Sequence, residues 1–400
     1  MAFSTIQGSG GAPDSFVGTS GVDSIVFEGN TSNFFLGAQQ ANDFIGFDNV
    51  GALQTGTVNL ATLKGGEGAD TFANLGGVQL VSSWINGNAN ADVMGSVAAG
   101  LSVITGTLQG GQGADIISIA LGQGSIVNGN KDNDTIQVTN GSAVSAESLF
   151  GGQGNDTISL GVTAAVTFTG SIINGDDDND LIQTQAAQAA GTFSGNTVFG
   201  GAGNDTINFG ATAGLIIDDI TVNGDDGNDV ITTGLGLDTV NGGAGNDAIT
   251  GGISNDSLTG GAGANEFIFT STSPTDATQV TAGTAAKLAA GRVDTITDWK
   301  SGSDIISGFG SDGAGNFGEA AGTNATYAAA LTAANVDFDA TGNNYFATAF
   351  GSGTNFTLVL FINQDGGAGA ADTDGAIILG SNFVSAASAI NSIADTDIIA

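Results

Sequence analysis

The sequence predicts an all-β fold in which short strands wind into stacked coils. An eight-residue phrase recurs between Gly65 and Phe267, with Gly at position one, Asp at position six and an apolar residue at position eight. Self-similarity at a short period is typical of repeat proteins. Each phrase leads into a short strand whose polar and apolar residues alternate, as in Thr206-Ile207-Asn208, and such alternation is typical of a half-buried strand.

The phrase occurs in two versions. The first reads GGQGNDTI at Gly151 and also starts at Gly65, Gly110, Gly200 and Gly242. The second reads GDDDNDLI at Gly175, replaces the second Gly by Asn or Asp, and also starts at residues 87, 129 and 224. Successive starts lie 18 to 25 residues apart, and nine apart at residues 242, 251 and 260. Between Gly224 and Gly242 the chain reads GDDGNDVIT and then TGLGLDTVN, which are two nine-residue units. We therefore interpret each gap of 18 to 25 residues as one coil, with a marked turn on one edge and a variable loop on the other.

Three regions follow from this pattern. Residues 1–63 are interpreted as an N-terminal cap or degenerate repeats, with weak echoes in GTSGVDSI from Gly18 and AQQANDFI from Ala38. Residues 64–269 form the repeat array. Residues 270–400 form a smaller C-terminal β-rich region, with strands expected at residues 356–362 and 377–379 and short helices at residues 281–290 and 327–334.

Composition excludes several classes of function. The net charge of −35, with only five Lys and Arg residues, argues against nucleic acid and anionic membranes as partners. The absence of His and Cys removes zinc-protease sites, Ser-His-Asp triads and disulfides. We therefore expect no enzyme. The chain has no apolar run of 18 residues, so we expect no transmembrane segment. The first residues, MAFSTIQGSG, lack a basic region followed by an apolar core, so we expect no cleavable signal peptide.

The repeated turn has the chemistry of a calcium site. Calcium takes six to eight oxygen ligands in flexible geometry. One turn offers one carboxylate and a few backbone carbonyls, so two stacked turns are needed to enclose an ion. Gly at positions one, two and four permits a positive φ, Asn at position five can hydrogen-bond the backbone locally, and the apolar position-eight residue anchors the turn in the core.

The phrase G-G-x-G-x-D-x-U-x resembles the calcium-binding repeat of the RTX family. The resemblance implies a right-handed parallel β-roll with multiple calcium ions between coils. It also implies turn glycines at Gly65, Gly110, Gly151, Gly200 and Gly242, and acidic ligands at Asp70, Asp92, Asp115, Asp134, Asp156, Asp180, Asp205, Asp229 and Asp247, with Asp238 and Asp256 on the opposite edge. Asn265 stands where Asp is expected, so the last site is weak or marks a stop.

Other interpretations of single features stay open. The turns could belong to a metal-free solenoid, and Asp176-Asp177-Asp178 could be a catalytic carboxylate group. NDT triplets also match a glycosylation signal. We expect Lys64 and Lys131 to face solvent and Trp84 to lie in the core.

The resemblance extends to location and function. VDTITDWKSGSDII from Val293 is similar to the segment after the roll in secreted RTX proteins, and the acidic and apolar C-terminus resembles a type I secretion signal. The first hypothesis is a secreted structural protein that self-associates on the cell surface as an S-layer, sheet or filament, through calcium and the variable loops. The alternative is an adhesin or glycan-binding module that contacts cell-surface polysaccharide. An RTX exoenzyme is the third.

Overall fold

The computed structural model describes residues 2–7, 15–17, 19–28, 31–32, 35–48, 57–74, 78–96, 101–121, 123–139, 144–161, 167–184, 191–210, 215–269, 294–299, 303–307, 317–324, 345–352, 355–362 and 375–379. Every described element is a β-strand. No helix that could span a membrane occurs in these ranges. The chain divides into two compact units, Met1–Asp218 and Asp219–Ala400, and each unit is described by itself. The predicted boundaries at residues 63 and 269 remain predictions.

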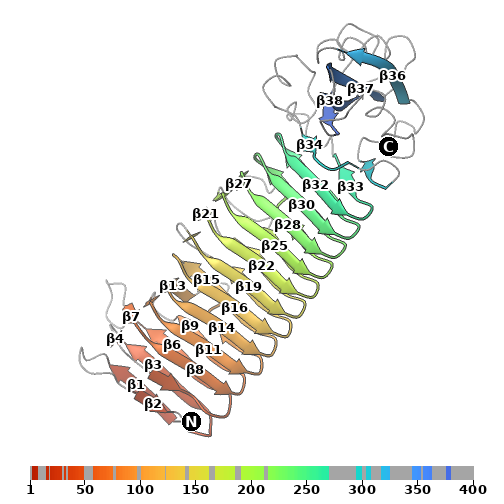
Figure 1. Cartoon of the computed structure of the whole chain (residues 1–400). Helices are drawn as coiled ribbons and strands as arrows, with labels where there is room; N and C mark the ends of the chain where they lie inside the picture. The colour runs from red at the N-terminus through yellow and green to blue at the C-terminus, as the bar shows by residue number, and fades with distance from the viewer. Residues whose placement is uncertain are drawn as a thin grey trace. The chain divides into compact units, whose positions relative to one another are not determined.

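Unit 1 is a parallel β-solenoid (Figure 1). A first sheet holds the strands that lead into the Asp turns: β2 (Ser15–Val17), β5 (Phe35–Gly37), β8 (Thr62–Glu67), β11 (Trp84–Ala89), β14 (Thr107–Gln112), β16 (Ile126–Lys131), β19 (Ser148–Gln153), β22 (Ile172–Asp177) and β25 (Thr197–Ala202). A second sheet holds the strands that follow the turns or continue their stack: β1 (Ala2–Gln7), β3 (Asp23–Glu28), β6 (Phe44–Asp48), β9 (Thr71–Asn74), β12 (Val93–Met94), β15 (Ile116–Leu121), β17 (Thr135–Val138), β20 (Thr157–Leu160), β23 (Leu181–Thr184) and β26 (Thr206–Asn208).

The core of unit 1 consists of two columns of apolar side chains. In the first sheet the column is fully buried and contains Leu63, Ile85, Leu108, Val127, Leu149, Ile173 and Val198. In the second sheet it contains Phe72, Met94, Ile117, Ile136, Ile158, Ile182 and Ile207. Each residue pairs in register with its equivalent in the next coil, as Ile85 does with Leu63 and Leu108. The predicted β-roll and its position-eight anchor are therefore confirmed.

The second edge is more ordered than the predicted variable loop. Most coils add a third short strand there, and these strands pair in two parallel groups: β4 (Thr31–Ser32), β7 (Thr57–Asn59), β10 (Gln79–Val81) and β13 (Leu101–Ile104), then β18 (Val144–Ser145), β21 (Thr167–Thr169), β24 (Gly191–Ser194) and β27 (Leu215–Asp218). A single left-handed residue then turns the chain into the first sheet, as at Ser82 (φ 47°) and Gly195 (φ 61°). Stacked rings of Phe168, Phe193 and Phe209 fill the interior beside these strands.

Unit 2 contains coils of the same kind. The strands β28 (Thr221–Asp226), β30 (Thr239–Ala244), β32 (Ser257–Ala262) and β34 (Thr295–Ile296) belong to one sheet, and β29 (Val230–Leu235), β31 (Ala248–Ile253), β33 (Glu266–Ile268) and β35 (Ile305–Ser307) to the other. β34 pairs with β32, and β35 pairs with β33. Residues 294–299 and 303–307 thus continue the solenoid.

The C-terminal strands of unit 2 pair differently. β36 (Phe317–Asn324) runs parallel to β37 (Tyr345–Ser352), while β38 (Asn355–Ile362) and β39 (Gly375–Ile378) continue with antiparallel pairing. The strands predicted at residues 356–362 and 377–379 are confirmed, with bounds shifted by a residue or two. The predicted helices at residues 281–290 and 327–334 lie outside the described residues.

Candidate metal centre

The position-six aspartates of unit 1 form one buried column along the turn edge. Each of them is at most 3% exposed. The members are Asp70, Asp92, Asp115, Asp134, Asp156, Asp180 and Asp205, as predicted, and also Asp23 and Asp43. Sequence reasoning missed the last two, although GTSGVDSI and AQQANDFI place both at position six.

From Asp43 to Asp205, one carboxylate oxygen of each aspartate connects two coils. The Oδ1 atom accepts a hydrogen bond from the backbone N–H of the equivalent residue one coil earlier, as Asp156 Oδ1 does from Asp134 at 2.7 Å. The same bond recurs along the column at 2.7 to 2.8 Å. A hydrogen bond to a carboxylate is stronger than one between neutral groups, so the column reinforces the stacking of the coils.

The second carboxylate oxygen is buried and has no hydrogen-bond partner among the described residues. This holds for the Oδ2 atoms of Asp43, Asp70, Asp92, Asp115, Asp134, Asp156 and Asp180. A buried, unpartnered carboxylate oxygen is costly. A cation in contact with these oxygens would remove that cost.

The glycine at position one leaves space beside this second oxygen. A Cβ atom added at Gly65 would lie within 3.0 Å of both Asp70 Oδ2 and the carbonyl oxygen of Gly87, and Gly110 and Gly151 show the same arrangement. The backbone of these three glycines has no positive φ. The prediction of a positive φ at position one is therefore wrong, because glycine is required there for space.

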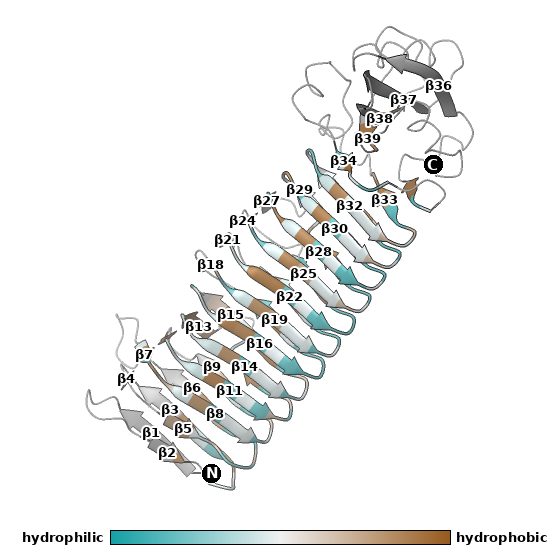
Figure 2. Ribbon diagram, viewed as in Figure 1, coloured by the Kyte–Doolittle hydropathy of each residue, from teal (hydrophilic) through white to brown (hydrophobic). Residues whose placement is uncertain are grey.

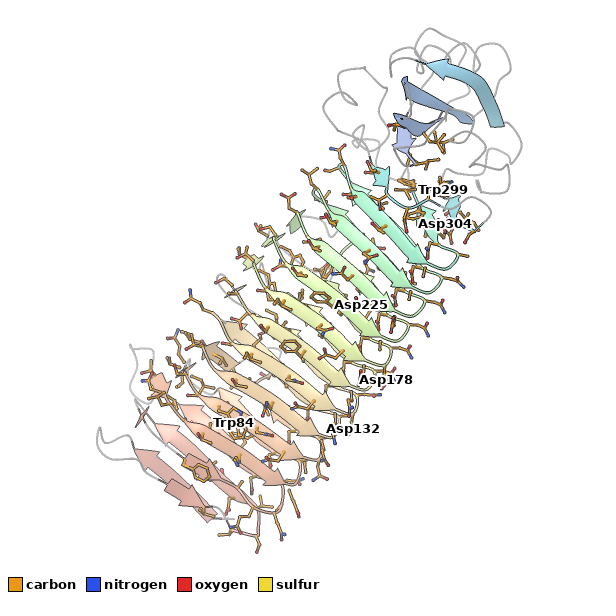
Figure 3. The ribbon with its side chains drawn as sticks, viewed as in Figure 1. Trp84, Asp132, Asp178, Asp225, Trp299 and Asp304 are labelled. Atoms are coloured by element: carbon orange, nitrogen blue, oxygen red, sulfur yellow. The ribbon has the colours of Figure 1, made fainter. Side chains whose placement is uncertain are left out.

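At positions two and four the predicted positive φ is confirmed. Gly66 and Gly68 have φ values of 106° and 129°, a region that side chains strongly disfavour. In the second version of the turn, Asp176 and Asp178 have φ values of 77° and 75°, in the left-handed region that Asp and Asn tolerate. Asn174 bonds Asp176 at position two, and Asp178 lies at the outer end of its turn, as Asp132 does in another coil (Figure 3). These extra acids therefore shape the turn.

Asparagines at position five link coils in the opposite direction. Asn155 Oδ1 accepts the backbone N–H of Asn179 at 3.0 Å, and Asn133 Oδ1 accepts that of Asn155 at 2.9 Å. The predicted local hydrogen bond is thus replaced by one between coils. Position-six side chains therefore bond each turn to the coil before it, and position-five side chains bond it to the coil after it.

Burial strongly affects the titration of the aspartate column. It raises the pKa of Asp92, Asp134 and Asp180 to about 8, and neighbouring aspartates add to the rise. It raises the pKa of Asp70, Asp115 and Asp156 to about 6. The two groups alternate along the column with the two versions of the turn. A bound divalent cation would invert this effect by favouring the ionised carboxylates.

The donor set fits a calcium ion better than a metal bound mainly by side chains. No three acidic side chains converge on one point in the described part of the chain. The oxygens that do approach each other are one carboxylate per coil and the turn carbonyls, such as Asp70 Oδ2 and Gly87 O. Calcium accepts such mixed oxygen sets with six to eight ligands, so stacked turns would share each ion.

The second edge of unit 1 carries a similar column that is mostly neutral. Ser125 N–H donates to Glu147 Oε2 at 2.9 Å, Glu147 N–H to Ser171 Oγ at 3.1 Å, and Ser171 N–H to Asn196 Oδ1 at 2.9 Å. All four residues are buried. This edge therefore keeps the hydrogen bonds between coils and, in this stretch, contains one buried acid, which sequence reasoning missed.

Glu147 should make the folded state pH-sensitive. Burial raises its pKa from 4.5 to about 7, and its Oε1 atom has no partner among the described residues. Its stabilising contribution is complete below the unfolded pKa of 4.5 and is lost as the pH rises through 7. In saturating calcium, we expect Glu147→Gln to increase the free energy of unfolding by about 1–3 kcal/mol at pH 8 and by much less at pH 5. Denaturant unfolding of both proteins at the two pH values checks this, and equal differences at both would contradict it.

Unit 2 has two acidic columns. Asp229 N–H donates to Asp247 Oδ1 at 3.0 Å and Asp247 N–H to Asn265 Oδ1 at 2.9 Å. Separately, Asp238 N–H donates to Asp256 Oδ1 at 2.9 Å and Asp256 N–H to Asp294 Oδ1 at 2.8 Å. The predicted placement of Asp238 and Asp256 on a second edge agrees with this geometry. Burial, followed by the charge of Asp294, raises the pKa of Asp256.

Asn265 does not end its column. Its N–H donates to Asp304 Oδ1 at 3.2 Å, so the idea of a stop at Asn265 is wrong. Asp298 caps the same region, because its two carboxylate oxygens accept the N–H groups of Gly260 and Gly261 at 2.8 and 2.7 Å. Asp294, Asp298 and Asp304 were missed as members of this network, although the similarity of their segment to the sequence after RTX rolls had identified its position.

The sequence predicts that Trp84 lies in the core and that Lys131 faces solvent. Trp84 is half-buried on the first sheet, where the Lys64 ammonium lies 5.4 Å from the centroid of its ring, so the prediction of a core tryptophan is wrong. Lys131 is exposed, as expected. Trp299, in unit 2, packs against Phe267 with ring centroids 6.4 Å apart.

These features define a class of protein: a parallel β-solenoid whose Gly-Asp turns stack buried carboxylates in columns. The model of the RTX calcium-binding nonapeptide repeat matches four stretches of the chain, residues 145–162, 189–215, 221–249 and 232–267. The chain therefore contains RTX calcium-binding repeats within its β-roll, and repeats of this kind bind calcium ions. No curated protein matches the chain.

Proposed function

We propose that the chain is a secreted structural protein that folds outside the cell when calcium binds and then self-assembles on the cell surface as an S-layer, sheet or filament. The observation that supports this proposal is the buried aspartate column, in which the Oδ2 atoms of Asp43, Asp70, Asp92, Asp115, Asp134, Asp156 and Asp180 have no hydrogen-bond partner among the described residues. The proposed ligands are the position-six aspartates of the two units together with carbonyl oxygens of their turns.

Calcium would couple folding to location. Stacking the coils buries many carboxylates in one line, which costs free energy unless positive charge accompanies them. Calcium supplies that charge, so its binding free energy becomes folding free energy. In a compartment with little free calcium, the chain would stay unfolded and suitable for type I export.

Composition supports a structural role. Only five Lys and Arg residues occur in the chain, so trypsin-like proteases find few cleavage sites in an exposed coat. The acidic turns also offer carboxylates, such as Asp132 and Asp178, at the outer ends of the coils (Figure 3). Calcium bridging between such groups on neighbouring copies would add contacts between subunits.

Electron microscopy tests the proposal. Purified protein should form ordered sheets or filaments in millimolar calcium and lose them in excess chelator. A protein that folds in calcium but remains monomeric at every concentration, and binds an array of glycans, would contradict self-assembly and favour the adhesin.

A further inference from the structure

On the outer face of the first sheet in unit 1, from β11 to β25, two outward rows of side chains contain no charged residue. Charged residues of these strands, such as Asp176, lie at the strand ends nearest the turns, which Figure 2 colours as hydrophilic in β16 and β22. The first row contains Trp84, Thr107, Ile126, Ser148, Ile172 and Thr197, which pair in register from strand to strand. In a chain with a net charge of −35, such a surface is unusual. Ile126 and Ile172 are 46% and 44% exposed.

This first row alternates strictly between large and small side chains. Trp84, Ile126 and Ile172 are large, and each is followed in the next coil by Thr or Ser. Neighbouring strands lie about 4.8 Å apart, so the large residues repeat about every 10 Å.

The second row alternates in the opposite sense. It contains Asn86, Gln109, Asn128, Phe150, Asn174 and Phe199, again in register. Each strand with a large residue in the first row therefore has Asn in the second, while the other strands carry Gln or Phe there. We call this pattern the checkerboard face, and its residues are those of the two rows.

The alternation follows the two versions of the turn. Asn86 and Asn174 belong to coils with the second version and accept hydrogen bonds from the N–H groups of Asn88 and Asp176, at 2.7 and 3.2 Å. Both donors have a positive φ. The turn geometry thus accounts for Asn86 and Asn174 in the second row.

We propose that the checkerboard face binds the same face of a second copy of this chain. The inference rests on the proposed self-assembly and identifies its contact surface. When two such faces meet with a displacement of one strand along the stack, the large residues of each copy lie opposite the small residues of the other. The match continues along the face because both copies have the same strand spacing. A partner with another repeat would lose this register within a few strands.

Charge also favours this surface for contact between copies. The turns carry acids such as Asp132, Asp177 and Asp178, so turn-to-turn contact between copies would meet repulsion unless calcium intervened. The contact area is on the order of 300–400 Å² per copy, given the strand spacing and two outward rows. This is well below the roughly 800 Å² per partner of stable complexes, so each contact is weak and operates in an array with others.

Opposite charges at one position test the proposal. In millimolar calcium, sedimentation velocity should show concentration-dependent association of the natural protein. Ile126→Lys and Ile126→Asp should each weaken it about tenfold or more, whereas an equal mixture of the two variants should associate again. The matched control is Thr239→Lys, at the equivalent exposed position of β30 in unit 2, where Thr221 and Ser257 are its small neighbours. It should associate like the natural protein.

The outcomes separate this inference from the proposed function. Circular dichroism in calcium establishes that each variant is folded. If both Ile126 variants associate as the natural protein does, the checkerboard contact is overturned while self-assembly stands. If the mixture of variants fails to associate, the contact between two copies of this face is overturned. If the folded natural protein shows no association, both proposals fail.

Discussion

Gly201→Ala is expected to destabilise the calcium-bound protein by roughly 3 kcal/mol. Gly201 stands at position two of its turn with a φ of 111°, and a left-handed backbone costs a side chain about 1–2 kcal/mol. The new Cβ would also lie within 3.0 Å of the carbonyl oxygen of Asp176 in the preceding coil. Such overpacking costs about 1–3 kcal/mol more, and the rigid stack gives the backbone little room to move.

Gly195→Ala is the matched control. Gly195 also has a positive φ, 61°, but an added Cβ would meet nothing within 4 Å. We expect a loss of only about 1 kcal/mol. Denaturant unfolding in saturating calcium measures both variants. Equal losses would show that backbone strain, not contact between stacked turns, limits substitution at Gly201.

Asp156→Asn should raise the calcium concentration required for folding by about tenfold, which corresponds to roughly 1.4 kcal/mol. The amide keeps an oxygen that can accept the Asp134 N–H, now bonded at 2.7 Å, as Asn265 Oδ1 accepts the Asp247 N–H in unit 2. It loses the negative charge of the second oxygen. Asp156→Ala removes both functions and should cost about 1.5–3 kcal/mol in addition.

A calcium titration followed by far-UV circular dichroism measures these effects. Asp177→Asn is the control, because it removes one negative charge from an exposed side chain of a neighbouring turn. Its calcium midpoint should change little. An equal shift in Asp177→Asn and Asp156→Asn would mean that the overall charge density, not ligation at position six, sets the calcium requirement.

The sequence predicts the parts of this fold that repeat by residue type. Gly, Asp and the apolar position-eight residue recur because each is the residue that fits its place. Asp70 and Asp156, for example, both bridge coils through Oδ1 and are buried. The fold class and the predicted aspartates on each edge could therefore be assigned without coordinates.

Residues that share a position but not a type were missed. Glu147, Ser171 and Asn196 all accept a backbone N–H at the second edge, and nothing in their chemistry alone marks them as equivalent. Asp43 was passed over because Ala38 stands where the phrase has Gly. Asp304 follows Asn265 by 39 residues, which breaks the period that would have identified it.

The position-one glycine shows a different limit of sequence reasoning. A glycine in a turn suggests a positive φ, but the required property at Gly65 is the space beside Asp70 Oδ2. Only the stacked coils reveal this requirement, since the atoms that would collide with a side chain come partly from the next coil.

Far-UV circular dichroism with and without calcium tests the central claim most directly. The buried aspartate column predicts β-structure in millimolar calcium, an unfolded chain in excess chelator, and recovery of the β-structure when calcium is restored. Unchanged β-structure in excess chelator at neutral pH would contradict the claim that calcium is required to stack these coils.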